Sequence, residues 1–390
     1  MQRIPVVSKK AVAGKRVLMR VDFDVAIEGG IIREDYRIRA NMSSIELVLV
    51  AGGYPRLIAH MGRPGGARVD VLSMAHIGAY CEKILKRKVI FVRDPFNESA
   101  RRRYQDSHEI LLFENIRFWQ GEEKNDRDFA YMLAEWGEAY INEAFANCHR
   151  AHASMDMLAR ILPAYAGLHL EKEIRNLGAV MKSPKRPFVA VLGGAKLETK
   201  LPLITRFVRR ADAVLIGGAL ANTLLSARGF SMGKSTIERD AVLFSSPALK
   251  SKRIILPQDV IIVDTFERGS WPRVVAIDKV PQDVYVGDIG PKTIVHFSEI
   301  LQKAAMIVWN GPLGYTELVQ CREGTEKIAE VITKSAAFTL IGGGDSIAAV
   351  SRAKMLNKFS FVSTGGGAML EFLAGKRLPG LEALKVTKKQ

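Results

Sequence analysis

The chain of 390 residues has few cysteines and no long apolar run. Its three cysteines, Cys81, Cys148 and Cys321, lie far apart and form no CxxC pair, which excludes a disulfide framework and a zinc site of the usual spacing. The longest uncharged stretch, residues 213–227, is too short to span a bilayer. The first residues, MQRIPVVSKK, lack the apolar core of a signal peptide. The sequence therefore predicts a cytoplasmic protein without a membrane partner.

Nucleic-acid-binding motifs are also lacking, although the formal net charge is +16. Such a charge attracts nucleic acids, anionic surfaces or phosphorylated small molecules. The basic residues are mostly dispersed, with one dense run at residues 101–103, and no zinc-finger, RNP-like or zipper pattern accompanies them. Nucleic acid is therefore not the expected partner.

Short apolar runs alternate with helical patterns along the chain, which is typical of βαβ units around parallel sheets. The runs are RVLMRVDF, PRLIAHMG, KVIFV, EILLFEN and AYINEAF in the first half, and PFVAVLGG, AVLIGG, IIVDTF, MIVWNGP, FTLIGGG and FSFVSTGGG in the second. The predicted fold class is α/β, with two doubly wound domains that each contain a parallel sheet flanked by helices, joined by an interdomain helix around a cleft.

The two halves meet at residues 170–187, LEKEIRNLGAVMKSPKRP. The part from Glu171 to Lys182 has the pattern of a charged amphipathic helix, which Pro184 and Pro187 then end. The predicted ranges are 1–169 for the first domain, 170–186 for the interdomain helix and 187–372 for the second domain.

Charged and amide side chains follow the strands of the first half, at the carboxyl ends where open α/β sheets bind ligands. They are Asp22, Asp24, His60, Arg63, Glu114, Asn115, Arg117, Asn142 and the cluster His149, Arg150 and His152. Together with Arg37, the arginines Arg63, Arg117 and Arg150 favour a site for a small anion. Guanidinium groups bind carboxylate and phosphate in bidentate fashion. Each arginine alone is equally typical of an ordinary surface.

The cluster in FANCHRAHASMD, residues 145–156, has two interpretations. It is a solvated loop after a strand, or it is a cationic cradle for an anion. No Ser-His-Asp or metal-ligand spacing recruits its histidines. On the second interpretation Arg150 binds the anion, while His149 and His152 orient the loop and tune its charge.

Glycines follow the strands of the second half, where they let the backbone approach a ligand and the next helix point its N–H groups at an anion. In VLGGAKLETK, Lys196 and Lys200 lie one helical turn apart and are expected on one helix face, where they could hold adjacent phosphates. In IGGGDS, Asp345 either caps a helix or holds magnesium bound to phosphates. These features predict a phosphotransferase with a nucleotide half and a half for a small anionic substrate.

The chain resembles the phosphoglycerate kinase family across nearly its full length. The motifs that carry the resemblance are VDFDV, AHMGRP, LFENIRF, NEAFANCHRAHAS, VLGGAKLETK, YVGDIGP, IVWNGPLGYTE, IGGGDS, STGGGA and GKRLPG. The resemblance implies a monomeric glycolytic enzyme that transfers a phosphoryl group reversibly between 1,3-bisphosphoglycerate and ADP, giving 3-phosphoglycerate and ATP with Mg²⁺. It also implies that residues 373–390 return to the first domain and that the domains close about a hinge.

The resemblance also implies roles for individual residues. The 3-phosphoglycerate site would comprise Asp22, Phe23, Asp24, Arg37, His60, Met61, Gly62, Arg63, Arg117 and Arg150. The ATP/ADP site would comprise Gly193, Lys196, Lys200, Gly217, Gly218, Gly287, Asn310, Pro312, Glu317, Gly342, Gly343, Gly344, Asp345 and Ser346. The catalytic set would be Arg37, Lys196, Gly343 and Gly344, with Asp345 on magnesium.

Three positions depart from the family pattern. Asp24 stands where the family has asparagine, and a carboxylate there would repel an anionic substrate. Glu143 replaces an aspartate, and Ala219 replaces a frequent glycine. Two alternatives follow: a kinase-like fold that has become a binding protein, or a kinase with a different acceptor acid.

Overall fold

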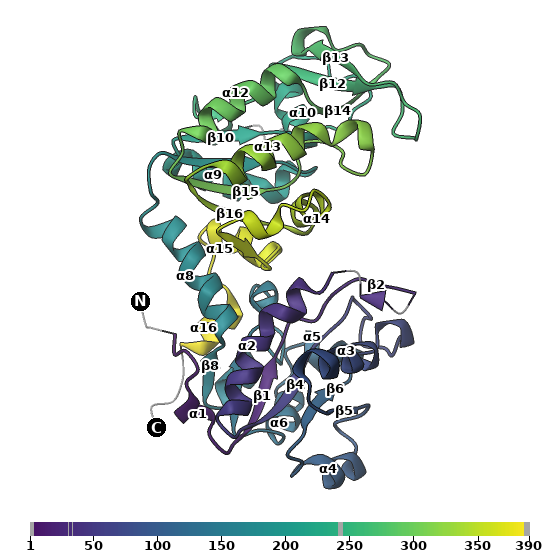
Figure 1. Cartoon of the computed structure of the whole chain (residues 1–390), viewed down its shortest axis with the longest axis vertical. Helices are drawn as coiled ribbons and strands as arrows, with labels where there is room; N and C mark the ends of the chain where they lie inside the picture. Colours follow the sequence, from purple (N-terminus) through teal and green to yellow (C-terminus); the bar gives the residue numbers. More distant parts are fainter. Residues whose placement is uncertain (1–3, 30, 33, 241–244, 386–390) are drawn as a thin grey trace. The chain divides into compact units, whose positions relative to one another are not determined.

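The computed structural model describes residues 4–29, 31–32, 34–240 and 245–385 (Figure 1). Contacts divide the chain into two compact units. Unit 1 contains the residues up to Arg175 together with those from Arg377, and unit 2 is Asn176–Lys376. The divisions thus fall at 175/176 and 376/377, whereas the predicted domains end at residues 169 and 372.

Unit 1 is built on a six-stranded sheet within the described residues, and all its strand pairs are parallel. The sheet order is β5-β6-β4-β1-β7-β8. The strands are β1 (Arg16–Arg20), β4 (Tyr54–Ile58), β5 (Val89–Val92), β6 (Ile110–Phe113), β7 (Ala139–Asn142) and β8 (Ala164–Ala166). A separate hairpin pairs β2 (Ile27–Glu28) with β3 (Ile31–Ile32). The central strands are almost entirely buried, as their uninterrupted apolar runs require in a sheet that is covered on both faces.

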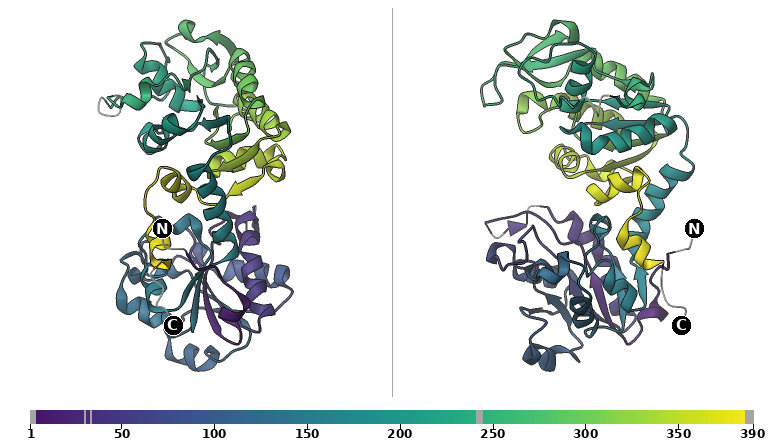
Figure 2. Two further views of the ribbon diagram at one scale, coloured as in Figure 1. Left: turned by 90° about the vertical axis from the view of Figure 1, so that its left-hand side faces the viewer. Right: turned by 180° about the vertical axis from the view of Figure 1, so that it is seen from behind.

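Helices lie on both faces of this sheet (Figure 2). They are α1 (Lys9–Val12), α2 (Tyr36–Val50), α3 (Ala75–Leu85), α4 (Glu98–Tyr104), α5 (Gln120–Glu123), α6 (Arg127–Ala134), α7 (Met157–Ile161) and α16 (Pro379–Leu384). The late helix α16 packs against α7 and β8, and the N–H of Gly380 donates to the carbonyl of Cys148 at 3.0 Å. The chain end thereby contributes to unit 1; residues 386–390 of the segment expected to return lie outside the described residues.

The first division between the units falls within helix α8 (Leu168–Lys182). The helix ends at Lys182 because Ser183 precedes Pro184, and a residue before proline disfavours helical backbone. At its other end, the Leu168 N–H donates to Ser44 Oγ at 2.8 Å and the Leu170 N–H to Glu143 at 2.8 Å.

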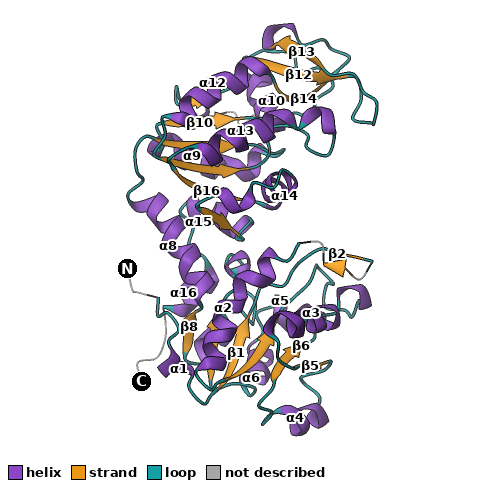
Figure 3. Ribbon diagram, in the orientation of Figure 1, coloured by secondary structure: helices purple, strands orange, loops and turns teal. Residues whose placement is uncertain are grey.

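Unit 2 contains a second six-stranded parallel sheet in the described part of the chain, with the order β11-β10-β9-β15-β16-β17. Its strands β10 and β16 are labelled in Figure 3. Its strands are β9 (Phe188–Leu192), β10 (Ala213–Ile216), β11 (Ile254–Ile255), β15 (Met306–Asn310), β16 (Phe338–Gly342) and β17 (Phe361–Ser363). Its helices are α9 (Leu197–Arg210), α10 (Gly218–Ala227), α12 (Pro291–Gln302), α13 (Glu323–Lys334), α14 (Gly344–Arg352) and α15 (Gly367–Leu373). No helix among the described residues has the length and apolar character needed to cross a bilayer.

One predicted strand belongs to a different sheet. The run IIVDTF forms most of β12 (Asp259–Val263), which pairs antiparallel with β13 (Arg273–Ala276) and β14 (Tyr285–Ile289). The expectation that it joins the parallel sheet is therefore wrong. Antiparallel neighbours need only a loop between them, whereas parallel neighbours need a crossover, and residues 264–272 contain no helix.

Both parallel sheets reverse their strand order near the middle. In unit 1 the chain continues from β1 to β4 on one side and later reaches β7 on the other; in unit 2 it continues from β9 to β10 and later reaches β15. The loops that follow such neighbouring strands diverge, and the crevice between them is where open α/β sheets bind ligands. The fold therefore singles out the ends of β1 and β7 in unit 1 and of β9 and β15 in unit 2.

The buried carboxylate of Asp259 fastens the antiparallel sheet to α12. It accepts hydrogen bonds from the N–H groups of Lys292 and Thr293, at 3.0 and 2.8 Å, and from Thr293 Oγ1 at 2.7 Å. We expect Asp259→Ala to lower the free energy of unfolding of unit 2 by about 3 kcal/mol, because it removes a helix cap and leaves buried donors unpaired. Urea titration followed by circular dichroism measures the change. The exposed Asp278 provides the control, and equal effects of Asp278→Ala and Asp259→Ala would contradict this role.

Candidate active-site residues in each unit

The carboxyl ends of the strands in unit 1 carry a group of basic side chains, here called the basic cluster. Its members are Arg20, His60, Arg117, Arg150 and His152. Burial lowers the pKa of His60 well below its ordinary value, and the charges of the three arginines lower it further. Burial likewise lowers the pKa of His152 to about 3. Both histidines are therefore neutral at physiological pH, so the positive charge of the cluster is carried by arginines.

Asp22 and Arg37 form an acid–base pair beside the basic cluster. Asp22 is buried, its backbone is held by the side-chain amide of Asn41, and its Oδ2 lies 3.5 Å from Arg37 Nη1. Burial raises the pKa of Asp22, while Arg37 acts in the opposite direction. Neither carboxylate oxygen accepts a hydrogen bond from the described residues. A buried acceptor in this state is suited to a hydroxyl or N–H donor from a ligand.

Asp24 holds the loop that follows β4. Its Oδ1 accepts a hydrogen bond from the Gly62 N–H at 3.0 Å, and Arg117 Nη1 donates to the Gly62 carbonyl at 2.8 Å. Gly62 has a φ of +61°, a conformation that suits glycine. Asn115 Nδ2 adds a hydrogen bond to the carbonyl of Met61 at 2.8 Å. Asp24 thus has a positioning role here that an asparagine oxygen would also fill.

The remaining residues expected at the 3-phosphoglycerate site, called the acid site below, differ in their exposure. The side chains of Phe23 and Met61 pack in the hydrophobic core of unit 1, so only their backbone is available to a ligand. Arg63 is exposed and Arg150 is half-buried. Arg117 is buried, and its burial, together with Arg20 and Arg150, lowers its pKa to about 10, which leaves it charged at neutral pH.

Two buried glutamates near this site accept hydrogen bonds from backbone N–H groups. Glu114 Oε1 accepts from the Met74 N–H at 2.8 Å, and its Oε2 accepts from Arg68 at 3.0 Å, which anchors the loop after His60. Glu143 caps α8 by accepting from the N–H groups of His169 and Leu170. A Cβ at Gly167 would lie 2.1 Å from the Glu143 carboxyl carbon. The glutamate at position 143, which is longer than the expected aspartate, therefore needs glycine at position 167. Burial raises the pKa of Glu143 to about 7.

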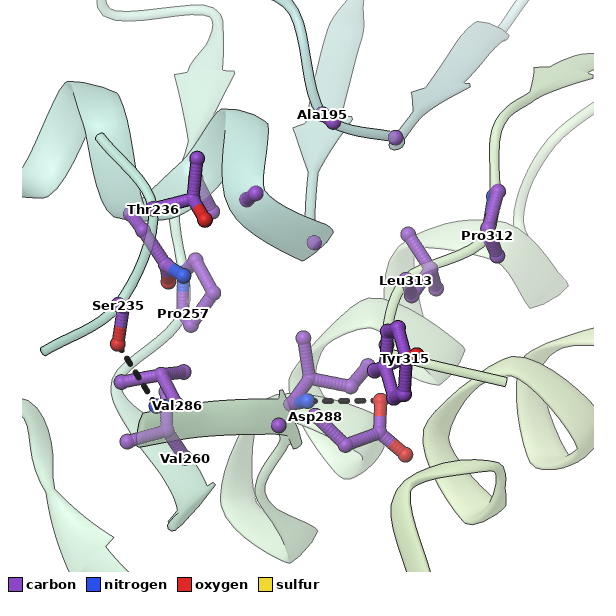
Figure 4. Close-up of a pocket in the computed structure, with 18 of the residues that line it drawn as sticks. Ala195, Ser235, Thr236, Pro257, Val260, Val286, Asp288, Pro312, Leu313 and Tyr315 are labelled. Carbon is purple, nitrogen blue, oxygen red and sulfur yellow. Dashed lines mark hydrogen bonds between the residues drawn. The ribbon is translucent and has the colours of Figure 1, made fainter. Parts of the chain in front are cut away.

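Unit 2 contains a cavity of about 420 Å³ (Figure 4). Pro312, Leu313 and Tyr315 lie along one side of it, and Ser235 and Thr236 along another. Of the residues expected at the nucleotide site, its lining includes Gly218, Gly287, Pro312, Glu317 and Asp345, together with Ala219. Part of its lining comes from residues that follow β9, β10 and β15, at the reversal of strand order in the sheet.

Gly193 and Gly217 lie behind the cavity lining and are needed for close backbone packing. A Cβ at Gly193 would lie 2.0 Å from the Pro312 carbonyl oxygen, and one at Gly217 would lie 2.7 Å from a methyl carbon of Leu313. The Gly193 N–H donates to the Asn310 carbonyl at 2.9 Å. These two glycines therefore join the loops after β9 and β15 and leave the surface of the cavity to their neighbours.

The two lysines of VLGGAKLETK differ in environment. Lys196 precedes the first residue of α9, has extended backbone and is exposed, so the two lysines do not share a helical face as expected. Lys200 lies in the first turn of α9, and its Nζ donates to Asn310 Oδ1. Burial lowers the pKa of Lys200 to about 8, against the raising effect of Asp345. Asn310 Nδ2 in turn donates to the Gly342 carbonyl at 2.7 Å, which connects Lys200 to the glycine run after β16.

The N-termini of α9 and α14 are not equally available to an anion. The N–H groups of Leu197 and Glu198 donate to the carboxylate of Glu238 at 2.9 and 3.1 Å, so the expectation that α9 points free N–H groups at a ligand is wrong. At α14, Gly343 has a φ of +102°, and no atom lies within 4 Å of a Cβ built at Gly344. The start of α14 is therefore the more open of these two helix N-termini.

A magnesium ion carried by a nucleotide fits this end of the cavity. Asp345 is exposed in the first turn of α14 and lines the cavity, so it offers one oxygen ligand. The hydroxyl oxygen of the buried Ser346 is already engaged in a hydrogen bond, which it accepts from the Gly311 N–H at 2.6 Å. The described residues contain no group of three or more metal-binding side chains, and magnesium in nucleotide sites takes most of its ligands from phosphates and water.

Comparisons with known proteins agree over nearly the whole chain. The family model of phosphoglycerate kinase matches residues 7–376. The phosphoglycerate kinase of Moorella thermoacetica is 42% identical over 378 residues, which cover 95% of this chain and 96% of the relative. That of Thermomicrobium roseum is 41% identical over 378 residues, with 95% and 96% covered.

Solved structures give the same result. Phosphoglycerate kinase from Coxiella burnetii aligns with a TM-score of 0.85 at 33% identity, covering 98% of this chain and 100% of the other. Phosphoglycerate kinase from Pyrococcus horikoshii aligns with a TM-score of 0.84 at 31% identity, covering 96% and 97%. The likeness thus includes both units.

The position of Lys200 predicts an unusual titration. In the ligand-free chain we expect its ammonium group to lose its proton with a midpoint near pH 8, below the ordinary value of 10.5, because burial disfavours the charged form. Asp345→Asn should move the midpoint lower, since it removes a negative charge that favours the ammonium. NMR titration of a chain labelled with ¹³C-lysine measures both midpoints. Asp278→Asn is the control, and a Lys200 midpoint above pH 10 would contradict its burial.

Proposed function

The chain belongs to the phosphoglycerate kinase family and is thus a phosphotransferase, and we propose that it transfers a phosphoryl group reversibly from 1,3-bisphosphoglycerate to ADP with Mg²⁺, giving 3-phosphoglycerate and ATP. One observation carries the proposal: the same chain has an arginine-rich strand-end site in unit 1 and, in unit 2, a glycine-lined cavity with Asp345, whose charge acts on Lys200. A kinase that joins an acid phosphate to a nucleotide needs both.

The acid substrate belongs to unit 1 in this proposal. The guanidinium groups of Arg63, Arg117 and Arg150 bind its phosphate and carboxylate, because they offer paired donors and stay charged. Asp22 accepts a hydrogen bond from the hydroxyl group of the substrate. This supplies the hydrogen-bond donor that the buried carboxylate lacks within the described residues. Arg37 neutralises negative charge on the phosphoryl group as it moves. Its ion pair with Asp22 orients the guanidinium beforehand.

The nucleotide belongs to unit 2. Its base and ribose occupy the cavity between Gly218, Gly287, Pro312 and Glu317, and its phosphates lie against the backbone of Gly342, Gly343 and Gly344. Lys196 steadies the moving phosphoryl group, and Lys200 binds the nucleotide phosphates. Magnesium, when bound with the nucleotide at Asp345, supplies positive charge that offsets the negative charge of the phosphates.

The chemistry needs no covalent intermediate on the protein. Phosphoryl transfer depends on positioning and on neutralising charge on the transferred group, which arginine, lysine and backbone N–H groups supply. The proposal includes closure of the two units about α8 to join the substrates and exclude water. It also includes a monomer in the cytoplasm, a role in glycolysis, and no nucleic-acid partner.

A coupled assay with the wild type and Arg37→Ala tests the proposal. We expect magnesium-dependent ATP formation from 1,3-bisphosphoglycerate and ADP, and a fall in kcat of about 10²-fold or more for Arg37→Ala, because a preorganised charge at the transferring group is lost. Arg39→Ala is the matched control on the same helix, since Arg39 is exposed and pairs with Asp35. It should stay within about twofold of the wild type.

The same preparation distinguishes the alternatives. A chain that binds both ligands without transfer, and that retards nucleic acid in a salt-dependent gel shift, would be a binding protein. A chain that transfers the phosphoryl group only to another acid would be a kinase of different specificity. Either result would overturn the proposed reaction.

Asp24 provides a further test of the acid site. Asp24→Asn should lower KM for 3-phosphoglycerate by about three- to tenfold, because it removes a negative charge near an anion while its oxygen can still accept from the Gly62 N–H. kcat should change little. Steady-state kinetics with varied 3-phosphoglycerate measures both constants. A rise in KM would show instead that the carboxylate itself is required.

A further inference from the structure

We infer that Arg20 is a positioning residue that fixes His60 in one tautomer, with its proton on Nε2, so that His60 serves the acid site as a neutral N–H donor. The inference rests on the proposed function for the identity of the acid, but its structural part does not. Arg20 is the last residue of β1 and is fully buried. It was not among the site residues expected from the sequence.

The three ends of the Arg20 guanidinium have separate partners. Nε donates to Ser154 Oγ at 2.9 Å, Nη1 donates to the Val21 carbonyl at 2.7 Å, and Nη2 lies 3.0 Å from His60 Nδ1. An arginine has no acceptor, so His60 Nδ1 must accept this hydrogen bond. In the neutral ring the proton therefore lies on Nε2.

The proton on Nε2 lies on the side of the ring toward Asp24. Nε2 lies 3.6 Å from Asp24 Oδ2, and the Asp24 side chain is 36% exposed, whereas His60 is almost completely buried. This separation is too long for a good hydrogen bond, so the donor remains available to a substrate oxygen.

The network behind Arg20 fixes the direction of every hydrogen bond. Ser154 Oγ accepts from Arg20, and it donates to Glu122 Oε1 at 2.6 Å; the Ser154 N–H donates to Glu122 Oε2 at 2.8 Å. Glu122 is fully buried, and this burial raises its pKa, while the charge of Arg20 acts in the opposite direction. The hydrogen-bonded series Glu122–Ser154–Arg20–His60 thus connects a buried carboxyl group to the loop of the acid site.

The surroundings keep His60 neutral. The charged or titratable groups that face it are Arg20 from β1, Asp24 after β1, Arg117 after β6, and Arg150 and His152 after β7. Apart from Asp24, these groups lower its pKa, and burial has the larger effect. The lowered pKa favours the neutral imidazole at physiological pH, so we expect it to orient a substrate anion and not to transfer protons.

Arg56 provides a comparison with an arginine that has only a structural role. Arg56 is also fully buried at a strand of the same sheet, but its guanidinium donates to backbone carbonyls, including those of Glu109 and Ser107 at 3.0 and 2.5 Å. Substitution of either arginine should therefore cost stability. Only substitution of Arg20 should change the state of His60.

Long-range ¹H–¹⁵N NMR of the full chain with ¹⁵N-labelled histidine tests the inference. In the wild type we expect His60 in the Nε2–H tautomer, with no titration from pH 5.5 to 8.5. The Nδ1–H tautomer, or a titration midpoint in that interval, would overturn the inference. This measurement needs no variant and no activity.

Arg20→Lys keeps the charge but loses the planar set of donors, and Arg56→Lys is the matched control. For Arg20→Lys we expect a mixture of His60 tautomers and a rise in KM for 3-phosphoglycerate of about tenfold, the effect of one hydrogen bond to a charged group, with a smaller change in kcat. Arg56→Lys should keep the wild-type tautomer and KM. Equal behaviour of the two variants would contradict a positioning role. A chain with the expected tautomer but without phosphoryl transfer would instead overturn the proposed function.

Discussion

Parallel strands place their carboxyl ends along one edge of a sheet, and both candidate sites of this chain depend on that constraint. In unit 1 the edge brings together side chains from residues 20 to 154, and in unit 2 it brings together glycines from residues 193 to 344. The reversal of strand order then separates the loops enough to admit a ligand. The two sheets share this geometry, so the different residues at their edges determine which ligand each one binds.

Unit 1 buries positive charge, which lowers the stability of the folded state unless the charge is compensated. Arg20 and Arg117 are almost completely buried, and an uncompensated buried charge costs several kcal/mol. The pKa values of His60 and His152 fall so that neither adds to it, and Arg20 and Arg117 lower the pKa of Glu122 against the raising effect of its burial. The arginine charge that remains is the attraction available to an anionic substrate. In unit 2 the open N-terminus of α14 offers backbone N–H groups, which can attract an anion in addition to the charge of the lysines.

Patterns that act along the chain were readable from the sequence, and contacts between distant residues were not. The apolar runs predicted the α/β fold with two parallel sheets, which the structure and the likeness to solved phosphoglycerate kinases confirm. The strand in IIVDTF was assigned to the wrong sheet because its antiparallel partners leave no mark in its own run. Arg20 and Ser154 were missed since they are separated by 134 positions and meet only in the fold. The occupied N-terminus of α9 was missed for the same reason, because Glu238 comes from a distant loop.

The division of the two ligands between the two sheets is the central claim, and hydrogen-exchange mass spectrometry of the full chain tests it most directly. 3-Phosphoglycerate alone should protect the backbone around residues 59–63, 115–118 and 147–154. ADP with magnesium alone should protect residues 193–197, 217–221, 311–317 and 343–347. Protection of the same segments by both ligands, or of unit 2 by 3-phosphoglycerate alone, would contradict the account.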